Sequence, residues 1–335
     1  MRLFMSSDVS LCSPSGLVLD RDEPTEVAGE NSFLEDVWSG LASDGKTLPC
    51  KYLYDEVGSR LFDDICEVPE YYVTRTEIAI LQENLDEIVD RLGTAATLIE
   101  PGAGSGLKTR LLLEHAKPSA YVPVDISGAY LAGVAATLQA DFPELCIEPL
   151  AADFTKPLPL VAPELDGSPR VLYFPGSTIG NFTPEEAIRL LAQWRHVAGE
   201  EGKLLIGVDL EKDARVLEAA YDDAAGVTAA FNRNLLTRIN RELDGTFDLE
   251  AFTHRATYNR RRARVEMHLD ASSRQTVHVG GRAFEFAAGE SIHTENSHKY
   301  SLARFERIAS EAGWRVDRVW SDADELFSEQ LLVAS

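Results

Sequence analysis

The chain has few cysteines and lacks any long apolar run. Its four cysteines are scattered through 335 residues, and no two of them form a CxxC pair. This usage predicts reduced thiols in a cytoplasmic protein rather than a scaffold held by disulfides. A membrane-spanning helix needs about 20 consecutive, mostly apolar residues, and no such run occurs. We therefore expect no association with a membrane.

Basic residues are also scarce. Lysine and arginine total 32, aspartate and glutamate total 55, and the net charge is −23. A chain with this charge repels nucleic-acid phosphates and anionic lipid surfaces. The basic segment Arg260–Arg264 reads as a solvated hairpin turn. The composition therefore argues against nucleic acid as a partner and leaves a small-molecule substrate.

Some familiar catalytic and metal-binding patterns are missing. There is no Gly-x-Ser-x-Gly elbow, and Ser105 has no evident histidine partner, so a hydrolase is disfavoured. The segment His293–His298 contains two histidines, but their spacing matches neither HExxH nor a Cys/His zinc pattern. We expect no metal site.

One glycine-rich turn has the composition of a ligand-binding loop. The apolar residues 96–99 end in Glu100, and the alternating glycines Gly102, Gly104 and Gly106 precede a helical segment. Glycine lets the backbone approach a ligand, and a helix N-terminus offers free N–H groups. The spacing differs from the GxGxxG dinucleotide fingerprint, which disfavours a nicotinamide-dependent dehydrogenase. An acid beside such glycines is typical of S-adenosylmethionine (SAM) methyltransferases; glycines that serve packing alone are the alternative.

Strands and helices alternate from about residue 76 to residue 210. Apolar segments that read as strands lie at 96–99, 121–125, 146–150, 171–174 and 203–210. The alternation predicts an α/β fold with a doubly wound, mainly parallel sheet, and ligands at the C-terminal ends of its strands. Polar residues follow these strands, namely Glu100, Asp125, Asp153, the segment Gly176–Asn181 and Asp209.

Two of these strand ends have the chemistry to bind a nucleoside. Asp125 ends the second strand, at the place where an acid binds ribose hydroxyls in nucleoside-binding α/β folds. Asp153 and Phe154 follow the third strand. An acid and an aromatic ring side by side can hold adenine by a hydrogen bond and by stacking, and an ordinary loop is the alternative.

The length predicts two domains, because single cores stop growing at about 250–300 residues. Residues 213–243 have helical periodicity, and 252–286 alternate with period two around a Gly280-Gly281 turn. We assign 31–75 and 211–300 to an α+β substrate-binding domain, 76–210 and 301–335 to a Rossmann-like cofactor domain, and 1–30 to a flexible tail. Residues 76–92 read as one helix that Thr76 caps and Gly93 ends.

Several segments together resemble one known family. They are Tyr54–Ser59, Pro69–Glu77, Gly176–Asn181, Tyr221–Asn234 and Thr294–Ser297. In this order they resemble the SAM-dependent histidine Nα-methyltransferases of ergothioneine biosynthesis, and the resemblance covers about residues 33–335. It implies three successive methyl transfers from SAM to the α-amine of L-histidine. The products would be hercynine (Nα,Nα,Nα-trimethylhistidine) and S-adenosylhomocysteine. We expect a monomer without a metal.

The resemblance assigns roles to side chains around the substrate. Asn181 and Tyr221 would hold the carboxylate, and both are neutral donors. Tyr71, Glu295 and Ser297 would surround the imidazole. A carboxylate that faces a ring N–H can distinguish imidazole from a phenyl ring, because a wrong substrate would leave buried polar groups unpaired.

Two further side chains would complete the substrate site. Tyr54 would lie near the amine and orient it, since the matched motifs contain no histidine or lysine as an obvious base. We expect in-line SN2 transfer from the sulfonium to a neutral amine, with catalysis mainly from positioning. Met267 would bound the ring pocket; ordinary core packing beside Val265 and Leu269 is the alternative.

The implied cofactor residues cluster around the glycine turn and the next two strand ends. They are Glu100, Gly102, Gly104, Lys108, Asp125, Asp153 and Phe154. The turn reads Gly-Ala-Gly-Ser-Gly, whereas Gly-Ser-Gly-Thr-Ser is frequent in the family. Both patterns contain the first two glycines, so only the cofactor contacts made by the third and later positions of the loop stay open.

Two alternative functions stay open at this point. The first is an N-methyltransferase of the same class that acts on another amino acid, such as a tryptophan derivative, although Glu295 and Ser297 favour imidazole. The second is a regulatory or scaffold protein that binds SAM without turnover. The complete set of pocket residues argues against this function.

Overall fold

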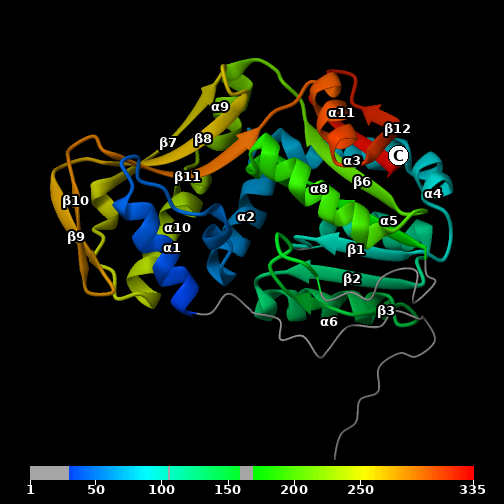
Figure 1. Cartoon of the computed structure of the whole chain (residues 1–335), viewed down its shortest axis with the longest axis horizontal. Helices are drawn as coiled ribbons and strands as arrows, with labels where there is room; N and C mark the ends of the chain where they lie inside the picture. The colour runs from blue at the N-terminus through cyan, green and yellow to red at the C-terminus, as the bar shows by residue number, and fades with distance from the viewer. Residues whose placement is uncertain (1–29, 105, 159–168) are drawn as a thin grey trace, which may run out of the picture.

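The computed structural model describes residues 30–104, 106–158 and 169–335 (Figure 1). The larger sheet comprises β1 (Thr97–Pro101), β2 (Ala120–Asp125), β3 (Cys146–Ile147), β4 (Leu150–Ala151), β5 (Arg170–Phe174), β6 (Lys203–Asp209), β12 (Trp314–Ser321) and β13 (Phe327–Ala334). The strand order is β12-β13-β6-β5-β1-β2, with β3 and β4 both paired to β2. Among the described strands of this sheet, β13 alone is reversed: it pairs antiparallel with β12 and β6, and the other pairs are parallel. The predicted mainly parallel sheet is confirmed. Residues 1–29 of the predicted tail (1–30) lie outside the described residues.

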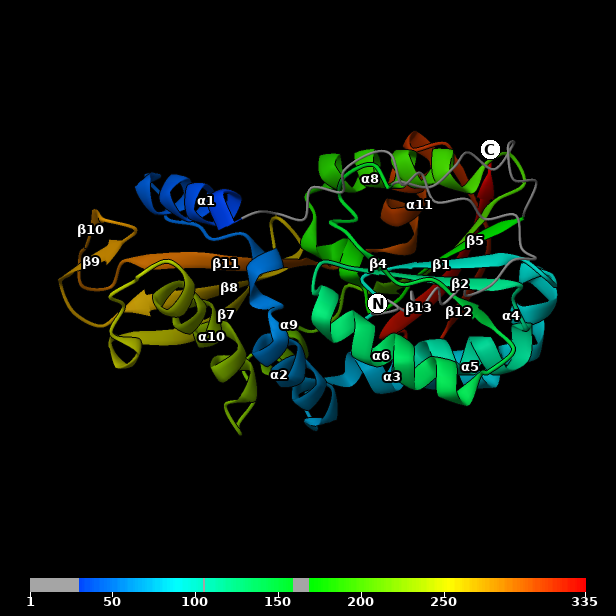
Figure 2. The same ribbon diagram turned by 90° about the horizontal axis from the view of Figure 1, so that it is seen from below.

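Helices cover both faces of this sheet. Figure 2 shows α8 (Pro184–Ala198) and α11 (Leu302–Glu311) on one face. The opposite face carries α3 (Tyr72–Glu83), α4 (Leu85–Leu92), α5 (Leu107–Ala116) and α6 (Gly128–Asp141). Neighbouring strand residues point to opposite faces, so Leu98 joins one buried core and Ile99 joins the other. Two covered faces explain why the parallel strands are almost wholly apolar.

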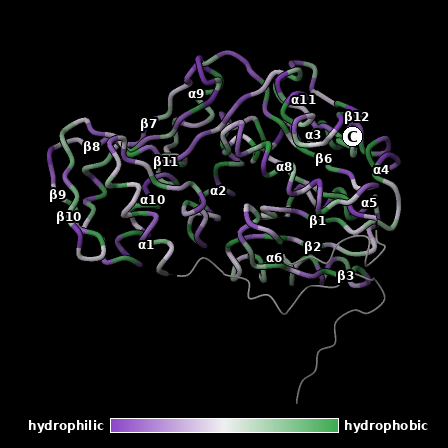
Figure 3. The backbone as a smooth tube through the Cα atoms, viewed as in Figure 1, coloured by the Kyte–Doolittle hydropathy of each residue, from purple (hydrophilic) through white to green (hydrophobic). Residues whose placement is uncertain are grey.

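Helix α8 shows how local sequence sets these layers. Thr183 and Glu186 form a capping box at its start, and Pro184 occupies the first turn. Its buried residues recur at helical spacing: Ala187, Leu190, Leu191, Trp194 and Ala198. Figure 3 shows hydrophobic and hydrophilic residues mixed along this helix, as burial of one side requires.

A smaller antiparallel sheet lies beside the first (Figure 1). Its order is β11 (Ser291–His298), β8 (Arg264–Ala271), β7 (Phe252–Asn259). Helix α10 (Val227–Glu242) packs on β7 and on α2 (Glu56–Glu67). The hairpin β9 (Gln275–Val279) to β10 (Arg282–Phe286) turns at Gly280 and Gly281, both at positive φ, as predicted. The two-domain division remains a proposal, which the separation of the sheets supports.

Two predicted elements are wrong in their bounds. The helix expected from Thr76 to Gly93 is two helices, because α3 begins at Tyr72 and Asn84 separates it from α4. The Asn84 side chain donates to the Ile80 carbonyl (2.8 Å), which satisfies the end of α3. The third strand is two short strands, β3 and β4. Pro149 lies between them and has no N–H to give to the sheet.

A buried glutamate ties α3 to the larger sheet. The carboxylate of Glu77 accepts the backbone N–H of Gly176 (2.7 Å) in the turn after β5, and it also pairs with Lys108. Gly207 on β6 leaves room for this carboxylate. A Cβ at position 207 would collide with Oε1 of Glu77 and lie 2.9 Å from Cζ of Phe327. The turn after β5 thus depends on a close approach that only glycine permits.

Gly207→Ala is expected to lower the free energy of unfolding by about 1–3 kcal/mol, because the added methyl group overpacks this contact. The matched control is Gly133→Ala in α6, where the position is exposed and a Cβ meets nothing within 4 Å. In this control the free energy of unfolding should rise by about 0.5–1 kcal/mol, because alanine has a higher helix propensity than glycine. Urea unfolding followed by circular dichroism measures both. A Gly207→Ala protein as stable as the wild type would contradict the packing argument.

Candidate active site

A cavity of about 550 Å³ lies at the C-terminal ends of the parallel strands. This volume is within the usual range for small-molecule sites. The predicted cofactor residues Gly102, Gly104, Asp125, Asp153 and Phe154 all line it. The cavity therefore unites residues from three separate strand ends, as the doubly wound topology predicts.

The glycine turn lies close to the aromatic wall of this cavity. Gly102 and Gly104 have φ of 72° and 52°, a backbone conformation that favours glycine. A Cβ at Gly102 would approach the Phe154 ring to 3.3 Å. Asp125 accepts the backbone N–H of Ser127 (2.8 Å), which orients its carboxylate at the end of β2. The turn, the carboxylate and the ring fit the shape and polarity of a nucleoside.

Glu100 and Lys108 do not line the cavity, although both were predicted to contact the cofactor. The buried carboxylate of Glu100 accepts hydroxyl hydrogens from Thr109 and Tyr121, each at 2.6 Å. Burial raises the pKa of Glu100 to about 7. Lys108 pairs with Glu77. Both side chains are engaged behind the glycine turn, Glu100 with the first turn of α5 and Lys108 with α3.

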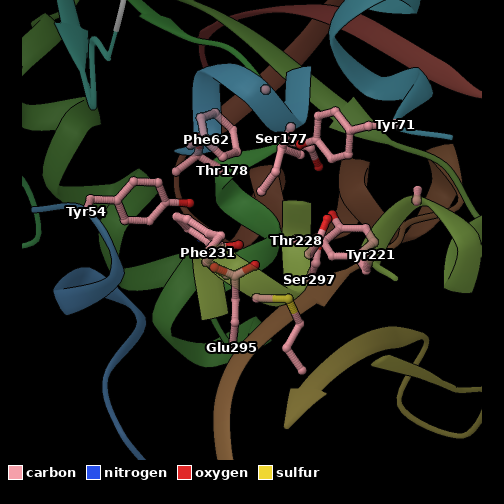
Figure 4. Close-up of a pocket in the computed structure, with 15 residues that line it drawn as sticks. Tyr54, Phe62, Tyr71, Ser177, Thr178, Tyr221, Thr228, Phe231, Glu295 and Ser297 are labelled. Carbon is pink, nitrogen blue, oxygen red and sulfur yellow. The ribbon is translucent and has the colours of Figure 1, made fainter. Parts of the chain in front are cut away.

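A smaller pocket adjoins this cavity (Figure 4). The pocket and the cavity have five residues in common, namely Tyr54, Phe62, Thr178, Asn181 and Glu295. All seven residues predicted for the substrate line the pocket: Tyr54, Tyr71, Asn181, Tyr221, Met267, Glu295 and Ser297. Three of them lie on strands of the smaller sheet and four lie at helix ends, so the fold brings together what the sequence separates.

The turn after β5 delivers Asn181 to this boundary. Asn181 lies at the end of the short 3-10 helix η2 (Thr178–Asn181), which begins after Ser177 in a left-handed conformation (φ 56°). The hydroxyl of Ser177 accepts the backbone N–H of Asp209 (2.9 Å), which ties η2 to the end of β6. Gly180 packs against β11, since a Cβ there would lie 2.7 Å from the carbonyl oxygen of His298. The segment is therefore held between the two sheets.

A register shift points Glu295 into the pocket. The pairing of β11 with β8 shifts between His293 and Glu295, which places Glu295 opposite Met267. Ser297, two residues on, faces the same side. Oε2 of Glu295 is buried and has no hydrogen-bond partner among the described residues. Burial raises the pKa of Glu295 to about 7, and Lys299 opposes that rise. A buried carboxylate oxygen without a partner favours the binding of a ligand that donates a hydrogen bond to it.

Aromatic rings form one wall of the pocket. The Phe62 ring lies edge-on to Tyr54 (5.7 Å between centroids) and 6.1 Å from Phe231, while Tyr71 lies edge-on to Tyr221 at 6.2 Å. In Figure 4 the hydroxyl of Tyr54 points toward the middle of this group. Burial raises the pKa of Tyr54 well above its usual range, so the phenol stays protonated. Phe62 was not predicted, and its helical spacing alone suggested ordinary core.

The sequence reasoning also missed a buried lysine behind the pocket. Lys299 is 0% exposed and donates to Asp209 (2.6 Å), Ser297 (2.8 Å) and Tyr221 (3.0 Å). The Ser297 and Tyr221 hydroxyl oxygens lie 2.7 Å apart. Lys299 directly follows β11 and continues the alternation of Glu295 and Ser297, and that period of two was the available sequence signal.

The sequence profile of a family described as "Histidine-specific methyltransferase, SAM-dependent" matches residues 33–334. The chain belongs to this family. It is 41% identical to the histidine N-alpha-methyltransferase of Mycolicibacterium smegmatis, over 89% of this chain and 94% of that protein. It is 40% identical to the enzyme of that name from Mycobacterium tuberculosis, over 89% and 93%. It is also 30% identical to ergothioneine biosynthesis protein 1 of Neurospora crassa, over 84% of this chain and 32% of that protein.

Membership confirms the family resemblance, the enzyme class and the dependence on SAM that the sequence motifs implied. Within the described ranges, no helix is long and apolar enough to cross a bilayer. The same ranges hold no group of three or more His, Cys, Asp or Glu side chains placed for a metal ion.

Glu295→Gln is expected to stabilise the ligand-free protein at pH 8 by on the order of 1–3 kcal/mol. The pKa of Glu295 rises from 4.5 to about 7 on folding, so the folded state holds the proton more tightly than the unfolded state. The penalty for the ionised carboxylate is absent below about pH 4.5 and grows as the pH rises through 7. The gain should therefore vanish near pH 4.5. Denaturant unfolding at both pH values measures it, and a variant less stable than the wild type at pH 8 would refute the argument.

Proposed function

We propose that this enzyme transfers three methyl groups from SAM to the α-amine of L-histidine, giving hercynine and S-adenosylhomocysteine in the first step of ergothioneine biosynthesis. The observation that carries the proposal is the adjacency of the two sites. The pocket with the unpaired Glu295 carboxylate opens on the cavity that holds the glycine turn, and Tyr54 and Asn181 line both. Membership of the histidine-specific family supports the same substrate.

The cavity has the residues to hold SAM. Gly102 and Gly104 would let the backbone approach the methionine part, Asp125 would bind the ribose hydroxyls, and Asp153 with Phe154 would hold the adenine. The positive φ of both glycines and the position of Asp125 at a strand end fit these roles. When bound, SAM supplies an electrophilic methyl group on its sulfonium.

The pocket would recognise histidine by its imidazole. Glu295 would accept one ring N–H, and Ser297 and Tyr71 would face the rest of the ring. A phenyl ring would leave the buried carboxylate unpaired, which disfavours phenylalanine strongly. Met267 belongs to the apolar core and also lines the pocket, so its two predicted roles are compatible. An indole offers one ring N–H to Glu295 but has no second ring nitrogen to face Ser297 or Tyr71, which favours imidazole.

Asn181 and Tyr221 would bind the substrate carboxylate, which leaves the amine near Tyr54. Because its pKa is raised, the Tyr54 phenol cannot serve as the base. In the first two transfers its oxygen can accept a hydrogen from the neutral amine and so turn the nitrogen lone pair toward the cavity. We propose that Tyr54 acts by orientation, which lowers the barrier without a change in its own protonation.

The proposed reaction is tested by mass spectrometry of the purified protein with SAM and all twenty amino acids. We expect histidine to gain one, two and finally three methyl groups while the other amino acids stay unchanged. Trimethylation of another amino acid would keep the chemistry but overturn the role of Glu295. Absence of methylation while SAM stays bound would favour a regulatory protein.

Tyr54→Phe is expected to lower kcat by about 10- to 100-fold, with a smaller change in the KM for histidine, because misorientation acts on the transition state. Tyr52→Phe is the matched control. The Tyr52 hydroxyl bonds to Asp36 (2.7 Å) outside both sites, so its removal should leave the kinetics near those of the wild type. Single-turnover assays that resolve the three methylations measure both variants. Full rates for all three steps in Tyr54→Phe would remove Tyr54 from the mechanism.

A further inference from the structure

Lys299 lies directly behind two side chains that face the substrate. It follows β11, is fully buried, and lines neither the pocket nor the cavity. Its ammonium has three hydrogens, and three oxygens surround it: Oδ2 of Asp209, Oγ of Ser297 and Oη of Tyr221. Every hydrogen of the ammonium therefore has an acceptor inside the protein, and none is left for a ligand.

The charges around Lys299 do not cancel. Asp209 is paired with both Lys299 and Lys212, and it also accepts the Tyr72 hydroxyl (2.7 Å). Burial alone would raise the pKa of Asp209, but the two ammonium groups hold it below its usual value. Burial lowers the pKa of Lys212 to about 8. With both lysines protonated, Asp209, Lys212 and Lys299 carry one excess positive charge. Little water screens it, because the cluster is buried.

The ammonium also sets the direction of two hydroxyl groups. An ammonium can only donate, so Ser297 and Tyr221 must each accept a hydrogen from Lys299. Their own hydroxyl hydrogens must point elsewhere. One of these two hydrogens makes the hydrogen bond between the Ser297 and Tyr221 oxygens, which lie 2.7 Å apart. The other is left for a ligand in the pocket that both residues line.

We propose that Lys299 is a positioning residue for the substrate carboxylate: by donating to Tyr221 and Ser297 it makes this pair a hydrogen-bond donor toward an anion in the pocket. The proposal deepens the proposed function and rests on it, since it takes the α-carboxylate of histidine as that anion. A donor polarised by an ammonium is stronger than a free hydroxyl, so the lysine acts on the substrate without contact.

Lys212 provides a matched control on the same carboxylate. It pairs with Asp209 and donates to the Tyr72 hydroxyl (2.6 Å) and the Leu210 carbonyl (2.5 Å). Within the part of the chain that the structure describes, no hydrogen bond joins Lys212 to Tyr221 or Ser297. Removing either lysine takes one positive charge from the group that the two lysines form with Asp209. Only Lys299→Met also removes the donor to the two hydroxyl groups in the pocket.

The experiment compares histidine with histamine, which has the same imidazole and amine but no carboxylate. Dissociation constants with S-adenosylhomocysteine present, and KM and kcat for histidine, are measured for the wild type, Lys299→Met and Lys212→Met. In Lys299→Met we expect histidine to bind about 10- to 100-fold more weakly, the range of one charge-assisted hydrogen bond, and histamine to change less than about threefold. In Lys212→Met the ratio of the two constants should stay near that of the wild type.

Equal weakening of both ligands in Lys299→Met would show a structural role and overturn the proposal, as would unchanged histidine binding. Thermal unfolding and binding of S-adenosylhomocysteine report whether each variant is folded. If Lys299→Met does not fold, Lys299→Gln keeps N–H donors in a similar volume but lacks the charge, and a smaller loss confined to histidine is expected. A wild-type enzyme that leaves histidine unmethylated would overturn the proposed function. A wild type that methylates histidine, with the same histidine-to-histamine ratio in Lys299→Met, would overturn the role of Lys299 alone.

Discussion

The ion pair between Asp209 and Lys299 joins the two sheets at the substrate pocket. Asp209 ends β6 of the larger sheet, and Lys299 follows β11 of the smaller one. Beside them, the backbone N–H of Tyr300 donates to the Asp209 carbonyl (3.0 Å). Each charge is wholly buried, and either alone would destabilise the fold by several kcal/mol. The pairing of the two charges therefore favours this junction of the sheets, where Tyr221 lies beside Ser297.

The pocket next to this joint combines satisfied and unsatisfied polar groups. The Lys299 ammonium has all its acceptors, whereas an oxygen of Glu295 has no partner among the described residues. A fully bonded group resists movement, and an unpaired one favours whatever ligand completes it. In the proposed function the scaffold supplies the rigidity and Glu295 the selectivity. Stability given up at Glu295 would then be recovered when the substrate binds, as in other preorganised sites.

Much of the fold could be predicted because it follows from local patterns. The alternation of apolar strands and helices, the glycine turn and the capping box before α8 depend on residues close in sequence. The helix break at Asn84 and the strand split at Pro149 were missed, since each depends on where a single backbone group finds its partner. The substrate residues could be proposed because their motifs match a family, and the structure brings all of them to one pocket.

By itself, the sequence determined the order of the strands and helices along the chain, the glycines of the cofactor turn and the family to which the enzyme belongs. Only the tertiary structure decided which buried charges pair. Glu100 and Lys108 lie beside the glycine turn in sequence, yet the fold engages them behind it. Lys299 has no motif of its own, and its role follows from Asp209, 90 residues away. Hydrophobic period and turn chemistry act over a few residues, whereas the partner of a buried charge is set by packing between distant segments.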